Sequence, residues 1–101
     1  MLNLQTIRRV TAYATEGLAD SLIAQCRTLG ARGYTVVEAR GVGTHPTADD
    51  PFTKNTHVKI EFLVNPTIGE KLMRHLQKLH SQRQPVTVCI EDVQVADPEH
   101  Y

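Results

Sequence analysis

Residues 57–64 read HVKIEFLV, a stretch in which apolar and polar side chains alternate until its end. Successive side chains of a β-strand point to opposite faces. One face is therefore expected to carry Val58, Ile60, Phe62 and Val64. The opposite face then carries His57, Lys59, Glu61 and Leu63. The pattern predicts a strand with one face in a hydrophobic core and one mixed face that meets solvent, a ligand or a neighbouring subunit.

Amphipathic helices are predicted on both sides of this strand. Before it, apolar residues recur at spacings of three and four, at Leu18, Leu22, Cys26 and Leu29. Gly30 follows where a left-handed helix C-cap belongs. After the strand, Asn65-Pro66 ends it, and Thr67 and Glu70 have the spacing of a capping box. A second apolar stripe follows at Ile68, Leu72, Leu76 and Leu79.

Three more strands complete the pattern. They are predicted at residues 5–14, at residues 34–40 and from Val86 onward, where Val86, Val88 and Ile90 alternate with other residues. The order β-α-β, long loop, β-α-β predicts an α+β, ferredoxin-like βαββαβ fold: a four-stranded antiparallel sheet with two helices on one face. Residues 1–101 are expected to form a single domain, with a flexible loop at about 41–56 and a polar C-terminal tail at about 94–101.

Composition excludes several classes of function. A chain of 101 residues has room for one compact domain. Eleven basic and eleven acidic residues cancel, which argues against nucleic acid or an anionic membrane as a partner. The longest apolar stretches fall far short of the ~20 residues that a membrane span needs. The N-terminus lacks the pattern of a secretory signal, so a cytoplasmic protein is expected.

Residue patterns also argue against the commonest alternative sites. RNA-recognition domains have this element order, but they stack bases on aromatic residues of the exposed sheet face, and Phe62 is expected in the core. His75 and His80 are five residues apart, not the four that would bring both rings to one metal. Cys26 and Cys89 lie within apolar patterns and are expected to be structural, buried thiols. No catalytic residues are identified, and the protein is not expected to be an enzyme.

The long loop is the most informative feature. Residues 41–56 have no periodicity and contain two prolines, two glycines and two aspartates. A stretch of this length without secondary structure inside a small domain is usually functional or disordered. Gly41 and Gly43 open the loop, and paired glycines at a strand end let backbone N–H groups approach an anion closely. The loop is therefore a candidate binding segment.

Residues 30–43, GARGYTVVEARGVG, resemble the G-x-x-G-hydrophobic-T-V-x-E-x-x-G-x-G segment of PII signalling proteins. The strand at 57–64 is similar to their third strand, and Ile90-Glu91-Asp92-Val93 resembles the end of their last strand. The resemblance implies a homotrimer with adenine-nucleotide sites between subunits, and a flexible T-loop that reports on the ligand. In this chain the T-loop corresponds to residues 41–56.

The resemblance also implies a set of nucleotide-binding residues. Thr35, Glu61 and Leu63 match positions that line the adenine pocket, and Tyr13 matches a position that packs on the base. The remaining nucleotide-binding candidates are Arg40, Gly41, Val42, Gly43, Lys59 and Arg83. Within the loop and just after it, a small anion such as bicarbonate has candidate ligands in Thr44, Lys54 and His57.

Departures from the family pattern narrow the expected ligand. The glycine-rich phosphate loop that ends in lysine is replaced by Ser81-Gln82-Arg83-Gln84, and two phosphate-binding arginines fall at Val95 and Asp97. Charge-assisted phosphate contacts are strong, so their loss favours ADP or AMP over ATP. The T-loop is short and lacks tyrosine. This resembles PII-like proteins of inorganic carbon metabolism, whose targets are bicarbonate transporters or carboxysome-related proteins.

One alternative remains open from the residues alone. A metal-binding, CutA-like or otherwise divergent PII-like protein would use His45, His57 or His100 as ligands. No metal site is assigned in the leading interpretation, which is a non-enzymatic sensor of an adenine nucleotide, with bicarbonate as a second candidate ligand.

Overall fold

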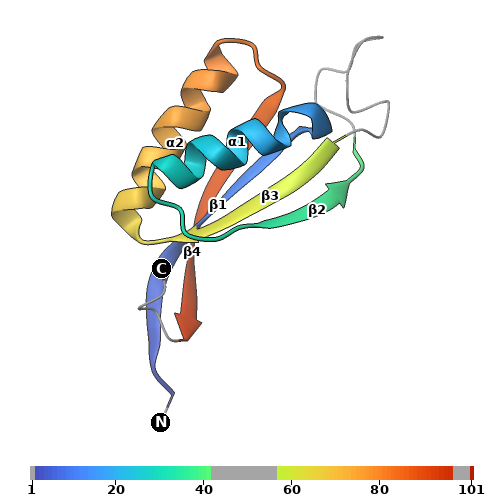
Figure 1. Ribbon diagram of the computed structural model, residues 1–101. Coiled ribbons are helices and arrows are strands. Elements are labelled where there is room, and N and C mark those ends of the chain that lie inside the picture. Colours follow the sequence, from blue (N-terminus) through green and yellow to red (C-terminus); the bar gives the residue numbers. More distant parts are fainter. Residues whose placement is uncertain (1, 42–56, 97–100) are drawn as a thin grey trace.

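The computed structural model describes residues 2–41, 57–96 and 101. Along the chain it contains β1 (Leu4–Thr15), α1 (Glu16–Thr28), β2 (Thr35–Ala39), β3 (His57–Val64), α2 (Pro66–Ser81) and β4 (Val86–Ala96). The strands form one antiparallel sheet in the order β2-β3-β1-β4. Both helices lie on the same face of this sheet (Figure 1). The predicted ferredoxin-like βαββαβ fold is confirmed.

The hydrophobic core lies between the sheet and the two helices. All four apolar residues predicted on one face of β3 are buried there. β1 contributes Val10, Ala12 and Ala14, which pair with Phe62, Ile60 and Val58 in the ladder. The helices add Leu22, Leu72 and Leu76. We call the opposite side, which neither helix covers, the open face.

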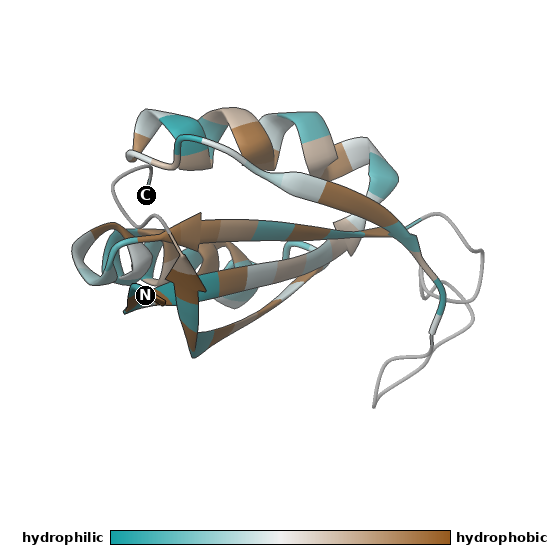
Figure 2. Cartoon of the chain, turned by 90° about the horizontal axis from the view of Figure 1, so that it is seen from below, coloured by the Kyte–Doolittle hydropathy of each residue, from teal (hydrophilic) through white to brown (hydrophobic). Residues whose placement is uncertain are grey.

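β2 forms one edge of the sheet and carries unusual apolar exposure. Val36 and Val37 point to opposite faces of β2, yet both are more than two-fifths exposed. They fall within the brown, hydrophobic stretch that Figure 2 shows along this strand. An exposed apolar edge strand is a surface on which another chain can pair or pack.

β1 and β4 extend beyond the other strands. Their ladder runs from Leu4 opposite Ala96 to Ala14 opposite Val86, whereas β3 pairs with β1 only from Arg8 onward. Residues 4–7 and 93–96 therefore form a two-stranded arm, visible at the lower end of Figure 1. The prediction of a tail beginning near residue 94 is wrong, because the alternation of Val93 and Val95 continues the strand to Ala96.

Helix α2 begins differently from the prediction. Its N-cap is Asn65, whose side-chain Oδ1 accepts a hydrogen bond from the Ile68 backbone N–H at 2.9 Å. Pro66 occupies the first turn, where a missing N–H costs nothing. The capping box expected at Thr67 and Glu70 is therefore wrong, since the helix has already begun at these residues.

Helix α1 ends as the sequence predicted. Gly30 follows the C-cap residue Leu29 and has φ +123°, a conformation that side chains disfavour. A Cβ atom at this position would also lie 2.5 Å from Cδ1 of Ile68. Gly30 thus allows the chain to turn from α1 toward β2 close to the start of α2.

The two cysteines differ from each other. Cys26 is buried in the core, and desolvation raises the pKa of its thiol to about 11, so it is an inert structural residue as expected. Cys89 is exposed, which contradicts the expectation of burial. It alternates with Val88 and Ile90, which pack against the core, so Cys89 faces the open side.

None of the helices in the described ranges is long and apolar enough to cross a membrane.

Substitution of Gly30 tests this account of the α1–β2 turn. We expect Gly30→Ala to lower the free energy of unfolding by about 1–2 kcal/mol, because of the positive φ and the contact with Ile68. Gly17→Ala is the matched control, since Gly17 lies in α1 and a Cβ there would meet nothing within 4 Å. Thermal and urea unfolding would measure the free energy of unfolding of both variants. A Gly30→Ala protein as stable as the Gly17→Ala protein would contradict the interpretation.

Candidate functional site

A pocket of about 400 Å³ lies where β2 begins and β3 ends. This volume falls within the usual range for small-molecule sites. The residues lining it are Arg32, Gly33, Tyr34, Thr35, Glu61, Leu63 and Tyr101. We call it the Glu61 pocket.

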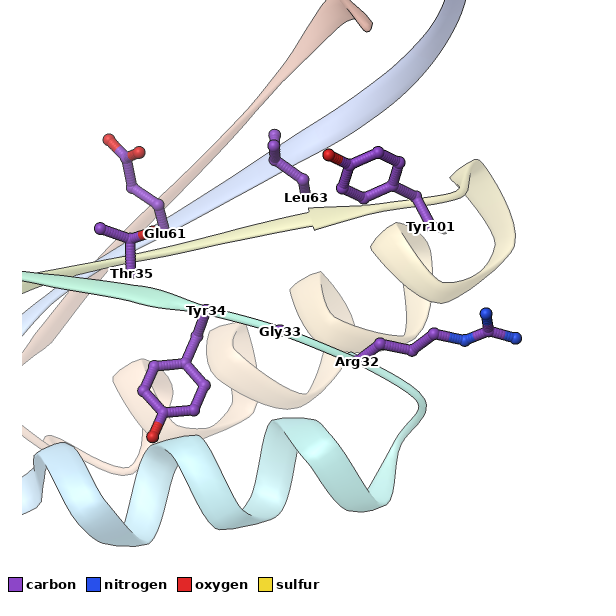
Figure 3. Close-up of a pocket in the computed structure, with 7 residues that line it drawn as sticks. All are labelled: Arg32, Gly33, Tyr34, Thr35, Glu61, Leu63 and Tyr101. Carbon is purple, nitrogen blue, oxygen red and sulfur yellow. The ribbon is translucent and has the colours of Figure 1, made fainter. Parts of the chain in front are cut away.

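The β2–β3 register builds the centre of this pocket. Thr35 lies directly opposite Glu61 in the ladder. Paired side chains on one sheet face have Cβ atoms only about 5 Å apart. Leu63 lies two residues further along β3 and therefore shares the open face. Figure 3 shows Thr35, Glu61, Leu63 and Tyr101 on one side of the two strands, whereas Tyr34 points toward α1 on the other side.

Glu61 gives the pocket an acceptor for a ligand that donates hydrogen bonds. Glu61 forms an ion pair with Lys59, with Oε1 3.1 Å from the lysine Nζ. The Glu61 side chain remains 27% exposed, so its carboxylate can also accept a hydrogen bond from a ligand. The Thr35 hydroxyl can donate or accept, and Leu63 offers apolar surface. This combination suits a flat ring with an amino group at its edge.

A second hollow lies at the opposite end of β2. It measures about 320 Å³ and is lined by Glu16, Glu38, Ala39, Arg40, His57 and Val58. We call it the Arg40 pocket. Arg40 and Gly41 are exposed, whereas His57 is only 4% exposed and pairs with Ala39 and Thr15 in the sheet. The five residues of β2 thus connect the Glu61 pocket with the base of the 41–56 loop.

Four of the predicted nucleotide-binding residues in the described ranges line neither pocket. Gly41 directly follows Arg40, and Lys59 forms the ion pair with Glu61, so these two lie beside a pocket. The other two are Tyr13 and Arg83. Tyr13 is on the open face, opposite Lys59 and Thr87, but lines neither pocket. Arg83 lies between α2 and β4, at the far edge of the sheet from β2. Three strand spacings of about 4.8 Å separate these edges. Arg83 and Arg40 of one chain are therefore not neighbours.

Several predicted residues cannot be placed. Val42, Gly43, Thr44, His45, Lys54 and His100 lie outside the described residues. Within residues 2–41, 57–96 and 101, no three side chains of histidine, cysteine, aspartate or glutamate gather as metal ligands would. No observation on the described residues therefore favours the metal-binding alternative.

Residue patterns missed part of the Glu61 pocket. Arg32, Gly33 and Tyr34 immediately precede Thr35, so their proximity could have been inferred from the start of β2. No pattern in the sequence indicated that Tyr101 would line this pocket. It reaches the pocket from a position far beyond Leu63 in the sequence, where its backbone O accepts a hydrogen bond from Asn65 Nδ2 at 3.3 Å.

Comparison with known proteins gives consistent results. The family model described as nitrogen regulatory protein P-II matches residues 7–100. A PII-like signalling protein of Thermus thermophilus is 26% identical, with a TM-score of 0.82 and 99% of each chain covered. A comparison with curated proteins found no match.

A second solved protein is similar in fold. CPII of Thiomonas intermedia is a nitrogen regulatory PII-like protein, solved with ADP, AMP and bicarbonate. It is 17% identical and has a TM-score of 0.80, with 97% of this chain and 95% of that chain covered. Because the family model spans nearly the whole chain, we conclude that the chain belongs to the nitrogen regulatory protein P-II family of regulatory proteins.

Proposed function

We propose that this protein is a cytoplasmic sensor that binds an adenine nucleotide, preferring ADP or AMP to ATP, and reports binding through its 41–56 loop. The observation that carries the proposal is the meeting of Thr35, Glu61 and Leu63 in one pocket of suitable volume. Support among known structures comes from CPII, which was solved with ADP, AMP and bicarbonate.

The Glu61 pocket has the chemistry to select adenine. The exocyclic amino group of adenine donates a hydrogen bond that the Glu61 carboxylate can accept. Guanine has a carbonyl oxygen at the equivalent ring position, which a carboxylate repels. Leu63 supplies apolar surface for the ring, and the Thr35 hydroxyl can adapt to a ring nitrogen. We therefore place the base in the Glu61 pocket. The phosphates would then extend along β2 toward Arg40 and Gly41.

Arg83 supports a site shared between subunits. It lies at the same end of the sheet as Arg40, but at the opposite edge (Figure 1). Arg83 of a neighbouring chain could therefore approach the phosphates that Arg40 of the first chain faces, if β2 of one subunit lies beside β4 of the next. The absence of arginine at positions 95 and 97 removes two cations of the family pattern, which favours ligands with fewer phosphates.

The surface supports assembly as a homotrimer. Tyr34, Val36 and Val37 are exposed along the β2 edge, and no helix covers the open face. A domain of about 100 residues gains stability when such surface is buried between copies.

The proposal also includes bicarbonate as a second ligand and a protein target. We assign a small-anion site to Thr44, Lys54 and His57, and the target to the bicarbonate transporters or carboxysome-related proteins of inorganic carbon metabolism. Ordering a polar loop costs about 1–2 kcal/mol per residue. A nucleotide and an anion that both contact the loop would share this cost and bind with positive coupling.

Calorimetric titration with ADP tests the base pocket. We expect wild-type protein to bind ADP and AMP at least as tightly as ATP, and Glu61→Ala to weaken ADP binding about 10- to 100-fold by removing a charged acceptor. Glu91→Ala is the matched control, because Glu91 also forms an ion pair on the open face. Bicarbonate in the buffer should tighten ADP binding.

Two results would contradict the proposal. ATP binding about ten-fold tighter than ADP binding would mean that other cations replace the two missing arginines. Equal ADP affinity for the Glu61→Ala and Glu91→Ala proteins would show that the base does not bind in the Glu61 pocket.

Arg83 offers a second test because its backbone is strained. It has φ 65° and occupies the position after the C-cap of α2, where its N–H donates to His80 O at 3.0 Å and the Gln84 N–H donates to Leu79 O at 3.1 Å. Glycine is the favoured residue there. We expect Arg83→Gly to raise the free energy of unfolding by about 1 kcal/mol and to weaken ADP binding several-fold. A more stable protein with unchanged ADP affinity would show that Arg83 does not bind phosphate.

Light scattering with an interface variant tests assembly. The wild-type protein should have the mass of three chains at micromolar concentration, because burial of the β2 edge favours association. Val37→Asp places a charge on that edge and should shift the protein toward single chains. Thr28→Asp, at the exposed end of α1, is the control and should leave the mass unchanged. A wild-type mass of one chain would contradict the trimer.

A further inference from the structure

Tyr101 supplies an aromatic ring to the open-face side of the Glu61 pocket. Its ring lies beside Leu63, and its hydroxyl points toward that side chain (Figure 3). The pocket's other tyrosine, Tyr34, points away toward α1 (Figure 3). The pocket therefore has an aromatic ring beside the apolar surface of Leu63, which lies between this ring and the carboxylate of Glu61 (Figure 3).

The amide of Asn65 anchors the backbone that carries this ring. Its Nδ2 donates to the backbone O of Tyr101 at 3.3 Å, while its Oδ1 accepts from the Ile68 N–H at 2.9 Å. Asn65 directly follows β3, whose residues Glu61 and Leu63 line the pocket. One side chain thus ties the start of α2, the end of β3 and Tyr101 together.

The ring forms a wall and does not fill the pocket. About 400 Å³ remains beside it with the Tyr101 side chain present. Tyr101 itself is half-buried, so one part of the residue packs on the protein and another part stays accessible. A flat ring entering this space would meet an aromatic face without displacing it.

We propose that Tyr101 is the stacking residue for the base of the nucleotide, and that Asn65 is the positioning residue that holds it there. The inference rests on the proposed function and deepens it by adding a binding group that the family pattern of residues did not indicate. Stacking on an aromatic side chain contributes substantially to base binding and tolerates different bases. Tyr101 would therefore set affinity, whereas Glu61 would set the choice of base.

Three variants separate these roles when ADP binding is measured by calorimetry. Tyr101→Ala should weaken ADP binding about 5- to 100-fold, because it removes the stacking surface. Tyr101→Phe should retain nearly wild-type affinity, because a phenyl ring also stacks. Asn65→Asp keeps an acceptor for the Ile68 N–H but loses the donor to Tyr101. It should therefore preserve thermal stability and weaken ADP binding.

Tyrosine fluorescence supplies a readout that a merely structural role would not change. The chain has three tyrosines and no tryptophan. ADP should quench the emission of wild-type protein, and Tyr101→Phe should abolish most of this quenching while still binding ADP. Unchanged quenching in Tyr101→Phe would place the base away from Tyr101.

The remaining outcomes distinguish this inference from the proposed function. Failure of wild-type protein to bind ADP would overturn both. ADP binding by wild-type protein with a Tyr101→Ala affinity within about two-fold would overturn the stacking role alone. Tighter binding by Tyr101→Ala would overturn it too, by showing that the ring obstructs the pocket. Wild-type affinity in Asn65→Asp would overturn the positioning role of Asn65.

Discussion

The register between β2 and β3 is the constraint on which the rest of the structure depends. It places Thr35 opposite Glu61 and sends both side chains to the open face. A shift of β3 by one residue against both of its neighbours, β2 and β1, would turn Phe62 outward and Glu61 into the core. Burial of the four apolar residues of β3 against the helices prevents this shift, because each contributes on the order of 1.5–3 kcal/mol to stability. The core of the fold thereby fixes the geometry of the Glu61 pocket.

The same alternation explains how much could be predicted from sequence. It predicted the faces of β3, and the apolar stripes of the helices completed the fold. Cys89 was misplaced because its apolar neighbours were considered without its position in the alternation. Asn65 was missed because both Asn65 and Thr67 could serve as the N-cap, and Pro66 decides between them by favouring the first helical turn.

The candidate site was harder to predict because its parts are distant in sequence. The family resemblance indicated Thr35, Glu61 and Leu63, and the fold brings these three together. No local pattern connects Tyr101 with Leu63, and in the structure a hydrogen bond from Asn65 holds the Tyr101 backbone near the end of β3. Tyr13 and Arg83 have the residue types expected of a ligand site. Tyr13 lies on the neighbouring strand β1, opposite Lys59, without lining the Glu61 pocket, and Arg83 lies beside the opposite edge of the sheet.

Strand β2 connects the proposed base pocket with the loop proposed to report nucleotide binding. One end of the strand contributes Thr35 to the Glu61 pocket, and the other leads through Arg40 to the 41–56 loop. A nucleotide lying along β2 would therefore contact both the base pocket and the loop that precedes β3. Because β2 is an edge strand with exposed apolar residues, a neighbouring subunit would also sense this contact.

The most direct measurement is a map of amide chemical-shift changes in ¹⁵N-labelled protein titrated with ADP. We expect the largest changes at residues 33–35 and 61–63, a second group at Arg40 and Gly41, and no change on the exposed face of α2. Changes confined to the helices, or none along β2 and β3 at saturating ADP, would contradict this placement of the nucleotide.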